Sequence, residues 1–257
     1  MIASKFSQLD ALMNMPLTEK IAYAEEVCRK QVDDKTVVAC SFGKDSMLAL
    51  WFARKVKSDV KVLYNDTGVE YPEVRRFAEE VRKSWDLNLE ILKPETTFWN
   101  LKAKYGWPHK RVEYNRGVRK GKSTPKCCIY LKEKPMQKWV NEHPEIEKII
   151  LGLTAEESRQ RKILFARYGS SCYFDNTRYV HPILKVNPIM PWRATDVWRF
   201  TRKNKIPICP SYAKYDLQRL GCWPCTGYTN WQKNLRRFSP KIYEIAMREK
   251  EGQTLLT

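Results

Sequence analysis

The chain has 257 residues, of which 43% are hydrophobic and 12% aromatic, a composition typical of a packed globular protein and not of a disordered chain. No apolar run approaches the roughly 18 residues that a membrane-spanning helix needs, and the first residues lack the apolar block of a secretory signal. We therefore expect a cytoplasmic protein whose cysteines are thiols or metal ligands. The formal net charge of +18 indicates a surface that attracts polyanions.

Apolar and β-branched runs alternate with amphipathic stretches along the chain. A helix is predicted over Leu17–Lys30, where apolar side chains recur at helical spacing. Further helices are predicted around Met47–Phe52 and over Pro72–Trp85, and strands over Thr36–Cys40, Val60–Asn65, Leu89–Leu92 and Lys148–Leu153. Strands separated by helices indicate a parallel sheet, so we predict an α/β, Rossmann-like fold with helices flanking the sheet.

The turn after the first predicted strand has the character of an anion-binding loop. It reads SFGKDS over Ser41–Ser46 and leads directly into a helix. A glycine there lets backbone N–H groups converge on a phosphate, and the helix N-terminus adds partial positive charge. We predict that Lys44 binds phosphates, that Asp45 holds Mg²⁺ or orients the loop, and that Ser41 and Ser46 donate hydroxyl hydrogen bonds. The Walker A spacing is absent, and an ordinary strand-to-helix turn is the alternative.

Other polar residues follow the later strands. In parallel sheets ligands bind at the carboxyl ends of the strands, where Asp66, Thr67, Gly68 and Thr154 are expected to lie. Arg159 and Arg161 are predicted to bind phosphate, with a salt bridge to Glu156 or Glu157 as the alternative. The predicted nucleotide ligands are thus Ser41, Phe42, Gly43, Lys44, Asp45, Ser46, Asp66, Thr67, Gly68, Thr154, Glu157 and Arg159, and the predicted catalytic residues are Lys44, Asp45 and Ser46.

A dense run of lysine and arginine lies between Lys102 and Lys126, with Glu113 as its one acid and with Tyr105, Trp107 and Tyr114 interleaved. Basic charge for phosphates combined with aromatic faces for stacking is how single-stranded nucleic acid is usually held. The alternatives are a solvated loop and a clamp on one small nucleotide. The predicted nucleic-acid contacts are Lys110, Arg111, Arg116, Arg119, Lys120 and Lys122. A second basic stretch, with Trp231, Lys233, Arg236 and Arg237, is predicted to be helical.

Two pairs of cysteines have the spacing of a soft-metal site. Cys127 and Cys128 are adjacent, and Cys222 and Cys225 flank a Trp-Pro turn. Four thiolates suit either a [4Fe–4S] cluster or a tetrahedral zinc, and the adjacent pair is awkward for zinc, whose ligand pairs are usually spaced C-x₂₋₄-C. Of the other cysteines, we expect Cys28 and Cys40 in the core, Cys172 in an exposed polar loop, and Cys209 as a less favoured substitute ligand.

Several of these motifs together resemble a known family. Val38–Ser46 resembles the PP-loop of the N-type ATP pyrophosphatases, specifically the subgroup of adenylyl- and phosphoadenylyl-sulfate reductases. The resemblance continues through Asp66–Glu73, Gly152–Arg159 and the Gly221–Thr226 cysteine turn, and covers about residues 30–240. It implies an adenine nucleotide alpha hydrolase-like sheet and a [4Fe–4S] cluster held by Cys127, Cys128, Cys222 and Cys225.

The resemblance also suggests a division of the chain. We expect an N-terminal helical segment at 1–32, a PP-loop nucleotide-binding α/β domain at 33–200 with a basic insertion at 102–126, and a C-terminal cluster-binding and helical region at 201–257.

Two departures from the reductases bear on function. Those enzymes carry a nucleophilic cysteine in a C-terminal Glu-Cys-Gly tail, whereas this sequence has no cysteine after Cys225. Their loops tend to be degenerate, whereas Lys44-Asp45-Ser46 keeps the form seen in enzymes that split ATP, and Thr154 stands where many relatives have a basic residue. We therefore expect adenylation and not sulfate reduction.

A strongly basic member of this kind resembles the ATP pyrophosphatase component of DNA phosphorothioation systems. That resemblance implies ATP with Mg²⁺, a DNA phosphate as the oxygen that is adenylated, and a cysteine desulfurase as sulfur donor. An adenylyl- or phosphoadenylyl-sulfate reductase, a tRNA thiolation enzyme and a non-catalytic nucleotide-binding module are the alternatives. No membrane partner is expected, and a homodimer stays open.

Overall fold

The computed structural model describes residues 2–108, 112–115, 118–122, 124–173, 179–228 and 230–254. The chain forms two compact units, and each is assembled from separate stretches of sequence. The sheet unit comprises Met1–Tyr64, Arg76–Ile91 and Trp139–Cys209. The cysteine unit comprises Asn65–Arg75, Leu92–Lys138 and Pro210–Thr257.

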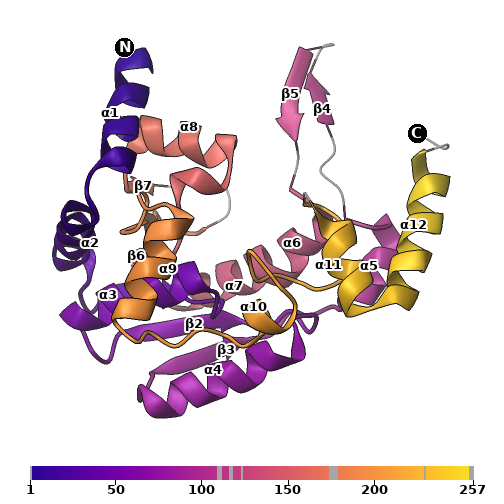
Figure 1. Ribbon diagram of the computed structural model, residues 1–257, viewed down its shortest axis with the longest axis horizontal. Helices are drawn as coiled ribbons and strands as arrows, with labels where there is room; N and C mark the ends of the chain where they lie inside the picture. The colour runs from indigo at the N-terminus through magenta and orange to yellow at the C-terminus, as the bar shows by residue number, and fades with distance from the viewer. Residues whose placement is uncertain are drawn as a thin grey trace. The chain divides into compact units, whose positions relative to one another are not determined.

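A six-stranded sheet organises the sheet unit (Figure 1), with strand order β3-β2-β1-β6-β8-β7. The strands are β1 (Thr36–Ala39), β2 (Lys61–Asn65), β3 (Leu89–Leu92), β6 (Lys148–Leu151), β7 (Ser171–Tyr173) and β8 (Leu184–Val186). β1 pairs in parallel with β2 and β6, and β6 pairs in parallel with β8. The predicted α/β fold is confirmed, with one difference: the edge strand β7 runs antiparallel to β8.

The four predicted strands are all present, and β7 and β8 are additional. Each of these two strands has three residues, which is too short for a periodic pattern to be read from sequence. The helices of this unit are α1 (Ile2–Asn14), α2 (Leu17–Gln31), α3 (Lys44–Val56), α8 (Arg159–Tyr168) and α9 (Ala194–Lys203). Two more helices, α4 (Pro72–Ser84) and α7 (Lys134–Glu142), begin in the cysteine unit and continue into this one.

Helix α3 is the central element of this core. It packs on β1 and β6 and also contacts α2 and α9. Its apolar residues from Met47 to Leu50 are fully buried, and so is Phe52. Phe52 stacks on Phe200 of α9 at 5.5 Å between ring centroids and meets Trp192 edge-on at 5.7 Å. A helix buried on almost every side explains why its sequence is so uniformly apolar.

A charged pair between two helices of this unit is largely buried. The Nζ atom of Lys20 lies 2.5 Å from Oδ2 of Asp196, and the two side chains are 3% and 20% exposed. The same Asp196 oxygen accepts a hydrogen bond from the Arg193 N–H and so caps α9. The ion pair therefore joins α2 to the start of α9.

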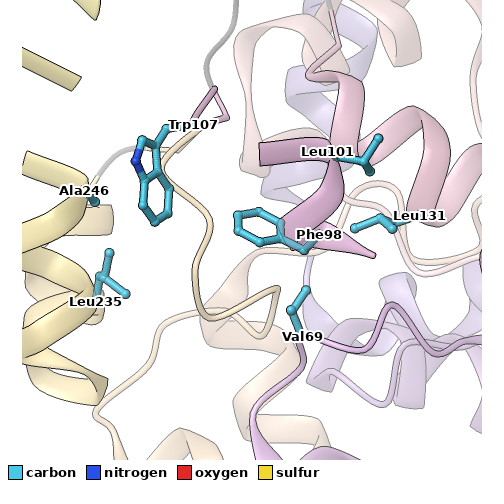
Figure 2. Packing of buried hydrophobic residues seen from close by; sticks show 7 residues of the cluster. All are labelled: Val69, Phe98, Leu101, Trp107, Leu131, Leu235 and Ala246. Atoms are coloured by element: carbon cyan, nitrogen blue, oxygen red, sulfur yellow. The ribbon is translucent and has the colours of Figure 1, made fainter. Parts of the chain in front are cut away.

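The cysteine unit is built from short helices around its own core. Its elements are α5 (Phe98–Tyr105), a β4–β5 hairpin (Val112–Asn115 and Val118–Lys122), α6 (Lys126–Cys128), a π-helical turn (Ile129–Glu133), α10 (Ser211–Lys214), α11 (Trp231–Phe238) and α12 (Pro240–Thr254). Figure 2 shows the core residues Val69, Phe98, Leu101, Trp107, Leu131, Leu235 and Ala246. Among the described residues, no helix is long and apolar enough to span a membrane.

Trp107 belongs to this core, which corrects one expectation. Its side chain is 1% exposed, and its indole N–H donates to Oε2 of Glu249 at 3.0 Å. Lys102, also from the predicted basic segment, forms an ion pair with Glu249 at 2.5 Å. Trp107 therefore offers no exposed face for stacking bases, because its ring is packed in the core between α5 and α12.

The buried carboxylate of Glu73 accepts hydrogen bonds from α10 and from the residue that follows it. Glu73 is 6% exposed and accepts hydrogen bonds from the Ser211 hydroxyl at 3.2 Å, the Lys214 ammonium at 2.5 Å and the Tyr215 hydroxyl at 3.1 Å. Three donors satisfy a carboxylate that burial would otherwise destabilise.

The buried ion pair yields a stability prediction. Replacing Asp196 by Ala leaves the Lys20 ammonium buried without a counter-charge, and we expect a loss of about 3–5 kcal/mol in the free energy of unfolding. Urea unfolding followed by circular dichroism measures it. The matched control is Glu147→Ala, which breaks the exposed Lys35–Glu147 pair and should cost about 1 kcal/mol or less. Equal losses in the two variants would contradict the prediction.

Candidate functional site

The Ser41–Ser46 loop connects β1 to α3 in the sheet unit. Phe42 holds it in shape: its φ is +56°, in the left-handed region that non-glycine residues rarely adopt. Its ring is fully buried and meets Tyr64 edge-on at 5.2 Å between centroids. Burial of a large ring is worth about 1.5–3 kcal/mol, which is enough to offset the roughly 1–3 kcal/mol of backbone strain.

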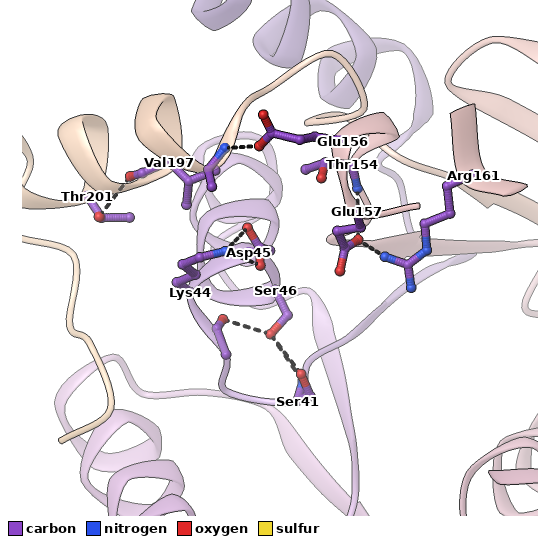
Figure 3. Close-up of polar contacts among 12 residues, drawn as sticks. Ser41, Lys44, Asp45, Ser46, Thr154, Glu156, Glu157, Arg161, Val197 and Thr201 are labelled. Atoms are coloured by element: carbon purple, nitrogen blue, oxygen red, sulfur yellow. Dashed lines mark hydrogen bonds and ion pairs between the residues drawn. The ribbon is translucent and has the colours of Figure 1, made fainter. Parts of the chain in front are cut away.

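The Ser46 hydroxyl ties the two ends of the loop together (Figure 3). It donates to the Gly43 carbonyl oxygen at 3.0 Å and accepts from the Ser41 N–H at 3.2 Å. The Cys40 thiol lies 3.6 Å from the same oxygen and accepts from the Phe42 N–H at 3.4 Å. Burial raises the pKa of Cys40 to about 11, so it stays a neutral hydrogen-bonding thiol. Cys40 is a core residue, as predicted, but its part in the loop has no signal in the sequence.

Lys44 and Asp45 form an ion pair at the beginning of α3. The Lys44 Nζ atom lies 2.8 and 2.6 Å from the two Asp45 carboxylate oxygens, and the Lys44 side chain is 7% exposed. Gly43 precedes the helix as its N-cap and has no side chain to cap it. The first turn of a helix has N–H groups without intrahelical acceptors and carries partial positive charge. The loop thus places a lysine and a carboxylate where an anion is favoured.

Gly152 brings the end of β6 against this loop. A Cβ atom at Gly152 would lie 2.5 Å from the Asp45 carbonyl oxygen and 2.6 Å from the Ser46 Cα atom. Distances this short to backbone atoms exclude any side chain. β1 and β6 pair with Ala39 opposite Leu151, so the two turns that follow these strands, Ser41–Ser46 and Gly152–Glu157, lie at one edge of the sheet.

Thr154 and Glu157 form a capping box at that edge. Glu157 Oε2 accepts from the Thr154 N–H at 3.2 Å, and Glu157 also forms an ion pair with Arg161. The salt-bridge alternative is therefore the observed one for Arg161. Arg159, the first residue of α8, is exposed and has no ion-pair partner among the described residues. Of the two arginines, Arg159 is the one whose charge is uncompensated within that part of the chain.

The predicted ligands Asp66, Thr67 and Gly68 belong to the cysteine unit. Asp66 Oδ1 accepts from the Gly68 N–H at 3.1 Å and forms an ion pair with Arg75 at 2.7 Å. The Thr67 N–H and hydroxyl both donate to Glu70 Oε1, at 2.9 and 2.5 Å. Their side chains thus form an internally hydrogen-bonded turn.

That turn is joined to the second pair of cysteines. Glu70 and Cys222 form an antiparallel backbone bridge, the Trp223 N–H donates to the Val69 carbonyl at 3.0 Å, and the Thr67 hydroxyl lies 3.6 Å from the Cys222 sulfur. This connection between residues about 150 positions apart could not be anticipated from sequence.

The four predicted ligands Cys127, Cys128, Cys222 and Cys225 lie in one unit and are close enough to affect one another electrostatically. A hydrogen bond with Cys128, then burial and the charges of Cys225 and Cys222, raise the pKa of Cys127 well above the usual range for a thiol. Burial raises the pKa of Cys225 to about 11. Neutral thiols crowded in this way become thiolates only when a cation compensates their charge.

Lys132 is a residue that sequence reasoning missed. When the thiols are ionised, the charge of Cys222, and then those of Cys128, Cys225 and Glu70, raise the pKa of Lys132. It lies in the π-helical turn that follows the cysteine pair, and π-turns often occur at functional sites. Its position one turn after Cys128 is the only signal in the sequence.

The four thiols match the implied metal in kind but not in their present arrangement. Four thiols gathered in one unit, beside a permanent cation, have the chemistry of an iron–sulfur or zinc site. Among the residues that the structure describes, however, no three His, Cys, Asp or Glu side chains form a ready-made metal site. The four cysteines are the right type of ligand for such a metal site and lie in one unit, but their sulfur atoms would have to move closer together to bind the metal.

The two residues that follow the Cys222–Cys225 turn contact the prolines on either side of the β4–β5 hairpin. The Thr226 hydroxyl is buried and donates to the Pro108 carbonyl at 2.8 Å, and Gly227 lies against Pro108 and Pro125. Between these prolines Lys110, Arg111 and Arg116 lie outside the described residues, whereas Arg119, Lys120 and Lys122 belong to β5. The stretch Trp231–Arg237 is helical, as predicted.

The remaining cysteines are buried. Cys28 is in the core, as predicted, and Cys209 is buried in the sheet unit. Cys172, which we expected in an exposed loop, is 7% exposed. It lies in β7 and pairs with Lys185 of β8, so edge-strand pairing buries a residue whose polar neighbours suggested a loop.

Comparisons with known proteins agree on one family. A model described as the phosphoadenosine phosphosulfate reductase domain matches residues 35–228. An adenosine 5′-phosphosulfate reductase of Bacillus cereus (strain B4264) is 30% identical over 199 residues, covering 77% of this chain and 75% of that enzyme. An uncharacterized protein of Methanocaldococcus jannaschii is 28% identical over 190 residues, and the match covers 74% of this chain but only 41% of the longer relative.

Solved structures show the same fold at low sequence identity. A phosphoadenylyl-sulfate reductase from Candida auris superposes with a TM-score of 0.56 at 18% identity, covering 78% of this chain and 88% of that one. The FMN adenylyltransferase of Candida glabrata, in complex with ATP, gives a TM-score of 0.56 at 12% identity, covering 86% of this chain and 69% of that one.

The Gly152 contact gives a prediction about the loop. Gly152→Ala would force the α3 N-terminus away from β6, and we expect at least a tenfold loss of adenosine-nucleotide affinity together with a stability loss of about 1–3 kcal/mol from overpacking. Calorimetry with nucleotide and urea unfolding measure the two effects. Gly221→Ala is the matched control, because its added methyl group meets nothing within 4 Å. Unchanged affinity in Gly152→Ala would show that the contact does not shape the loop.

Proposed function

Because the chain belongs to the phosphoadenosine phosphosulfate reductase domain family, we propose that its Ser41–Ser46 loop binds ATP and that the protein splits it into AMP and pyrophosphate. The observation that carries this proposal is the Lys44–Asp45 pair at the start of α3. A carboxylate in an anion-binding loop repels a nucleotide that comes without a metal ion. It favours one that arrives with Mg²⁺, whose preferred ligands are carboxylate and phosphate oxygens.

In the proposed reaction an acceptor oxygen attacks the α-phosphorus of ATP. The bond between the α-phosphorus and the bridging oxygen breaks, pyrophosphate leaves, and the acceptor carries AMP. Lys44 exchanges its contact with Asp45 for the phosphates and stabilises their charge, while Asp45 holds Mg²⁺. Ser46 keeps the loop closed through its bond to Gly43. Thr154, Glu157 and Arg159 at the same edge of the sheet are proposed nucleotide contacts, and Arg159 supplies the second positive charge.

The proposed acceptor is a non-bridging phosphate oxygen of DNA. The net charge of +18 supports a polyanionic substrate, with Lys110, Arg111, Arg116, Arg119, Lys120 and Lys122 as proposed contacts. Adenylation makes this oxygen, which is a poor leaving group by itself, part of AMP, which is a good one. The terminal sulfur of a persulfide, supplied by a cysteine desulfurase, then attacks phosphorus and expels AMP. A second thiol cleaves the resulting sulfur–sulfur bond, leaving a phosphorothioate and a disulfide.

The four cysteines are proposed to hold a [4Fe–4S] cluster. Cys127 and Cys128 would supply one pair of thiolates and Cys222 and Cys225 the other. When bound, the cluster supplies a redox-active, sulfur-binding centre. The chain's own contribution would be the Lys132 ammonium, which offsets part of the negative charge of the thiolates. The apolar core of the cysteine unit packs against Cys127 and Cys222.

An adenosine 5′-phosphosulfate reductase is the second candidate. The relatives of that name, about 75–78% of whose length is matched, favour it. The two functions differ in their products, because a reductase releases sulfite from the sulfonucleotide and a pyrophosphatase releases pyrophosphate from ATP.

The nucleotide proposal is tested by pyrophosphate release. We expect wild-type protein to release pyrophosphate from Mg-ATP when DNA is offered, and Lys44→Met to reduce the rate by about 10²–10³-fold, the effect of removing one transition-state donor. Lys55→Met on the same helix removes a lysine whose ion pair with Glu25 is exposed, and it should leave the rate unchanged. Sulfite release from adenylyl sulfate without pyrophosphate release from ATP would favour the second candidate.

The metal proposal is tested by elemental analysis after anaerobic reconstitution with iron and sulfide. We expect about four irons per chain and visible absorbance, both lost in Cys127→Ser and Cys222→Ser. Cys209→Ala, a buried cysteine of the sheet unit, is the control and should keep its iron. One zinc and no iron in the isolated protein would overturn the assignment.

A further inference from the structure

Two tyrosines of the cysteine unit stack on each other at its surface. Tyr105 ends α5 and Tyr130 lies in the π-helical turn, and their ring centroids are 6.2 Å apart with an interplanar angle of 24°. Both side chains are half-buried. The contact between α5 and α6 brings the rings together across 25 positions of sequence.

Three exposed lysines surround this pair. The Lys134 ammonium lies 4.2 Å from the Tyr130 ring centroid, and the Lys104 ammonium lies 5.5 Å from that of Tyr105. Lys126 begins α6 and lies four residues before Tyr130 in the π-helical turn that continues it, and residues at this spacing share a helix face. Among the described residues, none of the three lysines forms an ion pair with a carboxylate. Their charge is therefore available to an external anion.

We propose that Lys104, Tyr105, Lys126, Tyr130 and Lys134 form a binding surface for single-stranded nucleic acid, which we call the tyrosine patch. The rings supply faces for stacking bases, and the lysines supply cations for the phosphates beside them. Cys127 and Cys128 lie between Lys126 and Tyr130 in the chain, so a strand on the patch is held next to the cysteine centre. This inference rests on the proposed nucleic-acid substrate and adds the surface that holds it.

Stacking of a base on Tyr130 is expected to be more favourable than the contact of the Lys134 ammonium with the same ring. An exposed lysine over an aromatic ring contributes about 0.5–1 kcal/mol, whereas stacking of a base contributes about 1–3 kcal/mol. A base can therefore displace the Lys134 ammonium from the face of Tyr130. The displaced ammonium then binds a phosphate of the same strand, which adds the favourable release of counterions.

Fluorescence anisotropy with a labelled single-stranded DNA of about 16 nucleotides tests the patch. Replacing Lys104, Lys126 and Lys134 together by Gln should lower affinity about 10- to 50-fold near physiological salt and reduce the slope of log K against log salt by about 2. Tyr130→Ala should lower affinity about 5- to 150-fold, whereas Tyr130→Phe, which keeps the ring, should retain it. Single-stranded RNA and duplex DNA are measured in parallel.

The matched control replaces three exposed lysines outside the patch, Lys83, Lys203 and Lys241, by Gln, which changes the net charge equally. Circular dichroism verifies that each variant folds. Equal affinity and salt slope in wild type and the patch variant would overturn the proposal, as would duplex DNA binding that exceeds single-strand binding and is unaffected by Tyr130→Ala. Nucleotide calorimetry separates the two proposals, because patch variants should bind ATP normally even where they fail to bind DNA.

Discussion

The close approach of Gly152 to the first turn of α3 is the contact on which the nucleotide loop depends. A strand end and a helix end can touch backbone to backbone only where no side chain intervenes, and here even a methyl group would overlap Asp45 and Ser46. The contact brings the turn after β6 to the turn after β1. With Phe42 anchored in the core on one side and the Ser46 hydroxyl closing the other, the loop is shaped before any ligand binds. Preorganisation of this kind lowers the cost of binding.

In the cysteine unit, too, contacts between distant segments hold the candidate site in shape. Its four thiols come from two distant stretches of chain, and short-range contacts hold those stretches in place. Backbone bonds join Glu70 and Val69 to the turn that carries Cys222 and Cys225, and Thr226 bonds to Pro108. A centre assembled from separate segments needs such connections, because nothing in the local sequence holds the two cysteine pairs together.

Some lysines are paired with carboxylates within the fold, and others are not. Lys20, Lys44 and Lys214 are each satisfied by a carboxylate, so their positive charge is largely compensated within the structure. Lys104, Lys126 and Lys134 are exposed and lack such partners among the described residues, and Lys104 and Lys134 lie over tyrosine rings. The net charge of +18 is therefore a poor guide by itself. The lysines that can attract a polyanion are those that the fold leaves uncompensated.

Local sequence was sufficient for four strands of the sheet, for the helices α2, α3 and α4, and for the position of the loop. The runs Thr36–Ala39 and Leu89–Leu92 are strands, as their short length and their apolar and β-branched residues predicted. The hexapeptide after β1 is recognisable because glycine and lysine between a strand and a helix carry their own chemistry. Each of the two cysteine pairs is recognisable as a ligand candidate, since ligand type and the spacing within a pair are local properties, and metal binding by all four stays a prediction.

What only the tertiary structure decided are contacts between residues far apart in the chain. Trp107 lies in a basic segment typical of a nucleic-acid contact, but its ring is in the core. Cys172 has the polar neighbours of a loop residue, but it lies in an edge strand. Nothing in the sequence indicates that Tyr130 stacks on Tyr105. Propensity and pattern act over a few residues. Whether a given ring or thiol is buried or exposed depends on which distant segment packs against it, and that follows from the packing of the whole unit.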